Sequence, residues 1–171
     1  NTTGTQNTYL GREAGNSGTT ASYNCIVGHT AGYALTTGSY NTSLGNGSLR
    51  YNTTGAGNIA IGYDALRNNT TGAEQVAIGY ASLYTTTAGA TANVAIGKYA
   101  GYGLTTGYSN VFVGFQAGWD SGNGTTTGVN CVSIGAYSHP SSQTVYNEFV
   151  LGDGNINNLR CNDTSISALS D

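Results

Sequence analysis

The chain has 171 residues, of which 8% are charged, 27 are glycine and one is proline, and its formal net charge at pH 7 is −3. Disordered chains usually carry more charge and proline, and Gly, Asn, Thr and β-branched residues are modest or poor helix formers, so we expect an ordered all-β chain. Five Lys and Arg residues form no basic stripe for nucleic acid, and no apolar run approaches the length needed for membrane insertion.

A short apolar segment that ends in glycine recurs along the chain. Its clearest copies, residues 58–62, 75–79 and 93–97, read Asn-Ile-Ala-Ile-Gly, Gln-Val-Ala-Ile-Gly and Asn-Val-Ala-Ile-Gly. The motif glycines are 17 residues apart except for one interval of 18 and one of 21, and they are Gly11, Gly28, Gly45, Gly62, Gly79, Gly97, Gly114, Gly135 and Gly152. A fixed period of this size is typical of stacked identical units. It predicts a β-solenoid or β-roll rod of about nine rungs over residues 1–152, with a cap or junction at residues 153–171.

The start of the chain is in frame with this period. Thr2-Thr3-Gly4 occupies the position of Thr36-Thr37-Gly38 in a later unit, so the sequence begins in mid-repeat. We expect it to be a piece of a longer rod.

Each repeat begins with a predicted three-residue strand. Val94 and Ile96 alternate with Ala95, which places Val and Ile on one face, and we expect that face to point inward. The predicted inward pairs are Thr8/Leu10, Cys25/Val27, Thr42/Leu44, Ile59/Ile61, Val76/Ile78, Val94/Ile96, Val111/Val113, Val132/Ile134 and Phe149/Leu151. Two core side chains in 17 residues would fill a single-chain coil poorly, which favours an intertwined or laterally packed homotrimeric fibre.

The rest of each repeat predicts turns. The motif glycine ends the strand where the backbone turns or packs closely, and three residues later a small side chain indicates a crowded corner. These small residues are Ala14, Ala31, Ser48, Ala65, Ser82, Ala100, Ala117 and Ser138. Thr-Thr-Gly and Asn-rich segments predict solvent-facing turns and permit Asn or Thr ladders along the rod. Tyrosines in the variable positions are expected at the surface or at chain boundaries: Tyr23, Tyr33, Tyr40, Tyr63, Tyr80, Tyr102 and Tyr108.

The eighth interval is longer than the others. Residues 119–125 carry about four extra residues and include the only Trp. Insertions in a solenoid map to surface loops, often on the binding face, so Trp119, Asp120 and Asn123 are candidate ligand contacts. The alternative is a tolerated bulge without function. Beyond Gly152 the repeat ends, and a different unit there would shield the open end of a stack.

No catalytic, cofactor or metal site is indicated. Cys25, Cys131 and Cys161 have no metal-ligand spacing, and we interpret them as buried free thiols, with disulfides between chains as the alternative. His29 and His139 lie far apart, and the acidic residues do not recur at one repeat position. We therefore expect neither an enzyme nor a cofactor. Neighbouring threonines of a strand point to opposite faces, which argues against a paired ice-binding array.

The units at residues 58–66 and 75–83, joined by the Asn-Thr-Thr-Gly of residues 69–72, resemble repeats of phage tail fibres and tail-fibre-like proteins. This resemblance covers residues 1–152. The segment at residues 93–97 is also similar, more weakly, to head repeats of trimeric autotransporter adhesins. Residues 151–171 resemble the stretch that leads into an endosialidase-type intramolecular chaperone, where a Ser-Asp pair marks self-cleavage. Ser170-Asp171 matches that pair, which implies a release boundary between Leu169 and Ser170.

These resemblances imply a structural fibre of a phage or phage-like tail, found in the virion tail or outside the cell. We expect such a fibre to bind a cell-surface glycan and copies of itself, without catalysis, nucleic acid or membrane insertion. The alternative is a non-viral extracellular filament or adhesin, glycosylated at positions such as Asn41, Asn52, Asn68, Asn69 and Asn123.

Overall fold

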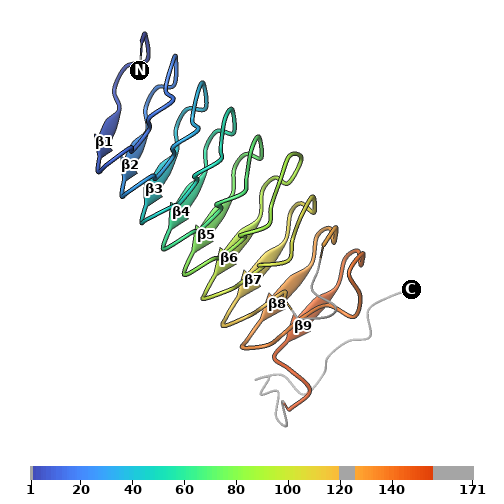
Figure 1. Cartoon of the computed structure of the whole chain (residues 1–171). Helices are drawn as coiled ribbons and strands as arrows, with labels where there is room; N and C mark the ends of the chain where they lie inside the picture. Colours follow the sequence, from blue (N-terminus) through green and yellow to red (C-terminus); the bar gives the residue numbers. More distant parts are fainter. Residues whose placement is uncertain (1, 120–125, 156–171) are drawn as a thin grey trace.

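The computed structural model describes residues 2–119 and 126–155 and has one parallel sheet in that part of the chain (Figure 1). Its strands follow one another in space as in the sequence. They are β1 (Thr8–Leu10), β2 (Cys25–Val27), β3 (Thr42–Leu44), β4 (Ile59–Ile61), β5 (Val76–Ile78), β6 (Val94–Ile96), β7 (Val111–Val113), β8 (Val132–Ile134) and β9 (Phe149–Leu151). This all-β solenoid with rungs of about 17 residues confirms the predicted fold class, and eight strand-to-strand steps give a rod about 38 Å long.

The strand register is constant along the rod, even where the repeat length changes. Ile59 pairs with Val76, and Val111 pairs with Val132 although 21 residues separate them. Two backbone hydrogen bonds join the unit before β7 to the unit after it: the amide of Gly101 donates to the carbonyl of Ala117, and the amide of Thr105 donates to the carbonyl of Thr126. The extra residues of this unit therefore fall between positions 117 and 126 of the sequence.

The motif glycines are required by the close stacking of rungs. From Gly11 to Gly114 their φ angles lie between +129° and +140°, a region that L-residues rarely adopt. At Gly79, a Cβ atom would lie 2.5 Å from the carbonyl oxygen of Gly97 in the next rung. The predicted role of these glycines, a turn with close backbone packing, is confirmed.

The prediction of the inward strand positions is wrong. The middle residue of the strand is buried in β2 to β8, whereas the two flanking residues are exposed or partly exposed in every strand. The buried middle residues are Ile26, Ser43, Ala60, Ala77, Ala95, Phe112 and Ser133. The inside of one coil is narrow and is shared with side chains from the turns, so it accepts one residue per strand, which in most rungs is small.

The sequence predicted that the interior of a single-chain coil would be poorly filled. In the structure, leucine side chains from the turns fill it. Leu35, Leu49, Leu66, Leu83 and Leu104 are at most 1% exposed, and most of them belong to one continuous apolar cluster with the middle strand residues. The small residues three positions after the motif glycine are buried from Ala31 to Ser138, which confirms the predicted crowded corner. A single chain therefore has its own core, and the argument for a trimer from an empty coil does not hold.

An amide ladder runs through the interior beside the strands. Asn58 accepts a hydrogen bond from the backbone amide of Gln75 at 3.1 Å, and its side-chain amide donates to Asn41 Oδ1 and to the carbonyl of Gly72. The same pattern links Asn7, Asn24, Asn41, Asn93 and Asn110 to neighbouring rungs. A threonine ladder, in which Thr36 Oγ1 donates to the carbonyl of Thr53, runs along a turn. Both predicted ladders are present.

Candidate ligand-binding surface

Tyrosines gather on the turns that precede and follow the strands. The predicted surface location is confirmed, because Tyr23, Tyr40, Tyr63, Tyr80 and Tyr108 are exposed and Tyr33 and Tyr102 are partly exposed. The largest group, here called the aromatic face, comes from the first, second and fifth positions after the motif glycines of β4 to β7. It consists of Tyr63, Tyr80, Tyr84, Tyr99, Tyr102, Phe115 and Trp119.

The rung spacing arranges these rings in columns. Tyr63 and Tyr80 stack with centroids 5.1 Å apart and planes within 10°, and Tyr84 and Tyr102 stack at 5.1 Å within 8°. Parallel strands lie about 4.8 Å apart, so identical positions in successive rungs bring rings to stacking distance. Because stacked rings cover one another's faces, the columns present mainly ring edges and hydroxyl groups to solvent.

Trp119 joins the end of one column. Its ring lies 4.9 Å from that of Tyr102 and 5.5 Å from that of Tyr99, tilted by 51° to both. Of the three ligand contacts predicted in the long unit, Trp119 is therefore part of a larger aromatic surface, while Asp120 and Asn123 lie outside the described residues. Tyr84 and Tyr99 were not predicted from the sequence. Tyr84, Tyr102 and Trp119 each occupy the fifth position after a motif glycine, and this shared position could have identified them as one group.

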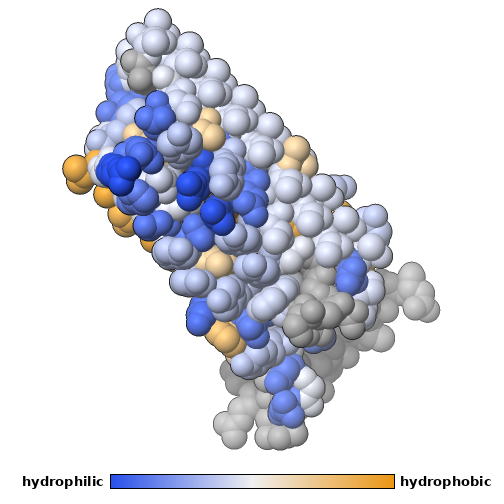
Figure 2. All heavy atoms as spheres, in the orientation of Figure 1, coloured by the Kyte–Doolittle hydropathy of each residue, from blue (hydrophilic) through white to orange (hydrophobic). Residues whose placement is uncertain are grey.

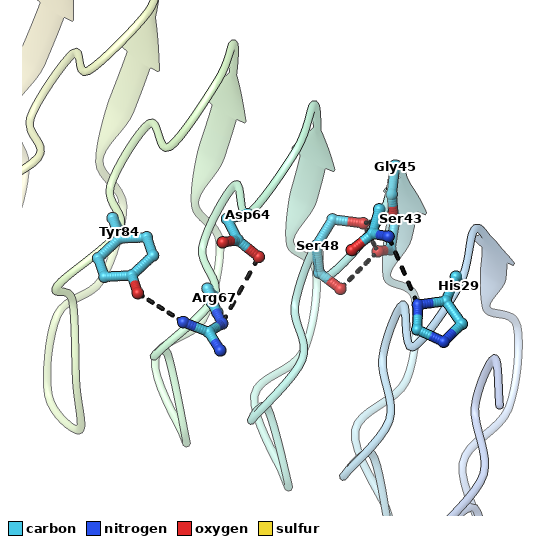
Figure 3. Close-up of polar contacts among 8 residues, drawn as sticks. His29, Ser43, Gly45, Ser48, Asp64, Arg67 and Tyr84 are labelled. Carbon is cyan, nitrogen blue, oxygen red and sulfur yellow. Dashed lines mark hydrogen bonds and ion pairs between the residues drawn. The ribbon is translucent and has the colours of Figure 1, made fainter.

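Cations lie among the aromatic rings. The ammonium group of Lys98 is 5.2 Å from the ring centroid of Tyr99, 5.6 Å from that of Tyr80 and 6.0 Å from that of Phe115. Arg67 lies between Asp64 and Tyr84 (Figure 3): its Nη1 donates to the Tyr84 hydroxyl at 2.5 Å, and its Nε is 3.5 Å from Asp64 Oδ1. These cations were not predicted as site residues.

Burial raises the pKa of two groups on this surface. Burial raises the pKa of Asp64, and the charges of Arg67 and Arg50 only partly oppose that increase. Burial, together with the neighbouring Tyr84 and Tyr99, raises the pKa of Tyr102 above its ordinary value of 10.0. The Tyr102 hydroxyl therefore keeps its proton, and its ability to donate a hydrogen bond, into the alkaline range.

A second surface consists of the flanking strand residues and is called here the outer sheet face. Its two columns run from Thr8 to Phe149 and from Leu10 to Leu151, contain no charged residue, and expose ten of their eighteen side chains. Leu10 and Phe149 are 65% and 63% exposed. The side seen in Figure 2 is mainly hydrophilic, and apolar residues gather along one margin near the N-terminal end.

Three of the predicted glycosylation positions are buried in the structure. Asn41, Asn52 and Asn69 are at most 1% exposed, and each donates an interior hydrogen bond from its side-chain nitrogen, the atom to which a sugar would be attached. Asn68 is partly exposed, and Asn123 lies outside the described residues. Glycans on the three buried residues are incompatible with this fold.

The cysteines differ from one another. Cys131 is a buried free thiol as predicted, whereas Cys25 is free but exposed, because it occupies an outward strand position; Cys161 lies outside the described residues. Within the described part of the chain, no group of three or more His, Cys, Asp or Glu residues is placed to bind a metal. No helix there is long and apolar enough to cross a membrane. The predicted release boundary at Leu169 and Ser170 falls on residues that the structure does not describe.

Comparison with known proteins gives no relative from which a role can be transferred. No protein-family model, curated protein or solved structure matches the chain. The molecule thus presents two distinct surfaces, the aromatic face with its cations and the uncharged, largely apolar outer sheet face.

Proposed function

We propose that this chain is a structural rod of a phage or phage-like tail fibre, in which three copies associate side by side and display a non-catalytic surface for a cell-surface glycan. The observation that carries the proposal is the uncharged outer sheet face that continues over nine strands. Since the core of each coil is complete without these residues, their apolar character has no role inside the single chain.

Association through the outer sheet face accounts for its composition. Val, Ile and Leu fill most of its positions, and an exposed apolar patch of this kind on a soluble protein marks an interaction site. The face also contains no charged side chain that would have to be desolvated in a contact with another copy. Copies placed side by side with level rungs would bring identical columns together, so that one contact is repeated along the rod.

Three copies, with the outer sheet faces turned to a common axis, are favoured over two by the resemblance to trimeric fibres and adhesins. Each rod would then carry three copies of the recognition surface, and weak single contacts would combine into a high avidity.

The experiment is a measurement of assembly mass for the protein and for Ile78→Glu. Ile78 lies centrally on the outer sheet face, so in an assembly the variant brings several carboxylates into an apolar contact, where unpaired charges are costly. We expect the unmodified protein to have the mass of three chains by native mass spectrometry and light scattering, and the variant to dissociate to folded monomers with unchanged circular dichroism.

Thr71→Glu is the matched control, because it adds the same charge on an exposed turn of an adjacent rung and should leave the assembly intact. A monomeric unmodified protein, or a variant that stays assembled, would contradict association through this face. A stable dimer would agree with association through the outer sheet face but would contradict the proposed assembly of three copies.

A further inference from the structure

We infer that the aromatic face binds an acidic polysaccharide that lies along the rod, with its carboxylate or sulfate groups near Lys98 and Arg50 and its sugar rings against the tyrosine columns and Trp119. This inference rests on the proposed recognition role and narrows it to a class of ligand. It follows from the charge balance of the surface, from the position of its cations and from its repeat.

The charge of this surface is opposite to that of the whole chain. Of the four cations within the described residues, Arg50, Arg67 and Lys98 lie on or beside the aromatic face. Arg12 occupies the same repeat position as Tyr63 but lies in the β1 unit, three rungs from the first ring of that face, and is paired with Glu13. The one carboxylate among them, Asp64, pairs with Arg67. Two positive charges therefore remain among the described residues of this surface, in a protein of net charge −3, which favours an anionic partner here.

The two remaining cations are available to a ligand. Neither Lys98 nor Arg50 forms an ion pair with another residue that the structure describes. Lys98 is exposed and held above three aromatic rings, while Arg50 lies 5.6 Å from the ring centroid of Tyr51. A ring attracts a cation through its quadrupole but leaves the net charge in place. Each cation is thus positioned by rings and still able to bind an anion.

The rings next to these cations suit a saccharide better than a small inorganic ion. Sugars combine hydroxyl groups with apolar C–H faces, and tyrosine and tryptophan offer an apolar body with a polar tip. Tyr80, whose ring lies 5.6 Å from the Lys98 ammonium group, and Tyr63, which stacks on Tyr80, each expose nearly half of their surface. The pKa of Tyr80 is raised, chiefly by the neighbouring Tyr99, so its hydroxyl remains a hydrogen-bond donor.

The repeat of the surface indicates a polymer. Rings recur at the first position after the motif glycine in the β4, β5 and β7 units and at the fifth position in the β5, β6 and β7 units, with successive rungs about 4.8 Å apart. The cations occur in the β3, β4 and β6 units. A chain with a regular series of acidic sugars can place several groups on such a surface at once. A single small sugar would use only one rung of it.

The test is direct binding of the assembled protein to polysaccharides that differ in charge. The probes are hyaluronate, which carries carboxylates, heparin, which also carries sulfates, and dextran of similar length, which is neutral. We expect at least one acidic polymer to bind at about 50 mM NaCl, to weaken strongly at about 300 mM, and to exceed dextran at both concentrations. Preference between the acidic polymers identifies the anionic group.

Two variants and one control assign the binding to this surface. We expect Lys98→Gln to weaken binding about fivefold and to reduce its salt dependence, and Trp119→Ala to weaken it without changing that dependence. Arg12→Gln removes the described cation that lies away from the aromatic face and should have no effect. Assembly mass is measured for each variant, so that loss of the rod is not mistaken for loss of the site.

Three results would overturn the inference: no binding of either acidic polymer, equal loss with Arg12→Gln and Lys98→Gln, or dextran binding as tightly as the acidic polymers. The last result would keep the proposed recognition of glycans and remove only the acidic class. A protein that binds acidic polymers as a monomer would keep this site and contradict the three-chain rod.

Discussion

At the scale of single residues, the motif glycine is the most restricted position of the repeat. Two independent constraints act on Gly79: its φ of +135°, and the carbonyl oxygen of Gly97 at 2.5 Å from where a Cβ would lie. Gly57 lies at a different position, where Tyr40 and Glu74 adopt nearly the same left-handed conformation in neighbouring rungs. The two glycines therefore differ in what they tolerate.

We expect Gly79→Ala to lower the free energy of unfolding by about 3 kcal/mol or more, because neither the backbone conformation nor the rung spacing accommodates a Cβ. Gly57→Ala should cost only about 1–2 kcal/mol, the usual cost of a left-handed L-residue, since the nearest atom would be 3.7 Å away. Urea unfolding of both variants measures the difference. Equal losses would mean that rung spacing does not restrict the motif position.

Asp64 provides a pH-dependent prediction at the same scale. Its pKa is raised from 3.8 by burial, so the folded state binds a proton more tightly than the unfolded state. The stability contribution is then greatest below the unfolded pKa and decreases as the pH rises toward the folded pKa. Asp64→Asn removes this decrease, and asparagine tolerates the φ of 54°.

Urea midpoints of the protein and of Asp64→Asn, measured between about pH 3 and pH 6, test this sign. We expect the variant to gain stability relative to the unmodified protein as the pH increases through this range. A constant difference between the two midpoints would show that the Asp64 pKa is the same in the folded and unfolded states.

At the scale of the rung, side chains of complementary size share the interior. Where the middle strand residue is small, as Ala60 and Ala77 are, the fourth residue after the motif glycine is Leu66 or Leu83. Where it is large, that residue is glycine: a Cβ on Gly118 would lie 2.3 Å from the Phe112 ring. In the rung of Ala95 both positions are small, because the side chains of Leu83 and Phe112 from the adjacent rungs occupy the space at Gly101. Large side chains therefore share the interior without overlapping.

This relation predicts a non-additive double variant. Phe112→Ala should cost about 3–5 kcal/mol by opening a cavity, and Gly118→Leu should also destabilise because the ring occupies its space. The double variant should be more stable than either single one, since it recreates the pairing of Ala77 with Leu83. Leu83 has a φ of 49°, so leucine accepts the backbone conformation required at this position. If the stability losses of the two single variants simply added in the thermal unfolding of the double variant, residues 112 and 118 would not share one interior space.

The amide ladder makes neighbouring rungs depend on one another. Asn58→Ala removes the acceptor of the Gln75 amide and the donor to Gly72, and leaves these buried groups without their partners. We expect a loss of about 2–4 kcal/mol in unfolding free energy. Asn68→Ala, at a partly exposed position, should change it by less than about 0.5 kcal/mol. Similar effects of both variants in urea unfolding would argue against a structural role of the ladder.

At the scale of the whole molecule, Cys25 reports on the outer sheet face. It is exposed in the single chain and lies on that face, whereas Cys131 is buried in the coil. In an assembly that covers the face, we expect Cys25 to react slowly with a maleimide and to become reactive in Ile78→Glu, while Cys131 stays protected in both. Cys161→Ser simplifies the assay. Equal Cys25 reactivity in both proteins would mean that the face is open to solvent.

The sequence by itself determined the period, the position of each strand and the need for the motif glycines. These features are local, because a strand of alternating residues followed by glycine has the same conformation in each unit. The small corner residues and the surface tyrosines also follow from their fixed positions in the repeat. The insertion near Trp119 was visible in the sequence as a longer interval between two motif glycines. The constant register of β7 with β8 shows that the sheet accommodates it.

Only the tertiary structure decided which side of each strand faces the core. Alternation separates Val94 and Ile96 from Ala95 but does not say which side is inside. The coil is too narrow for both large residues, because turn leucines and the amide ladder already occupy it, so the small residue faces inward and the apolar pair faces outward. The stacking of rings and cations on the aromatic face likewise required the distance between rungs, which no single repeat contains.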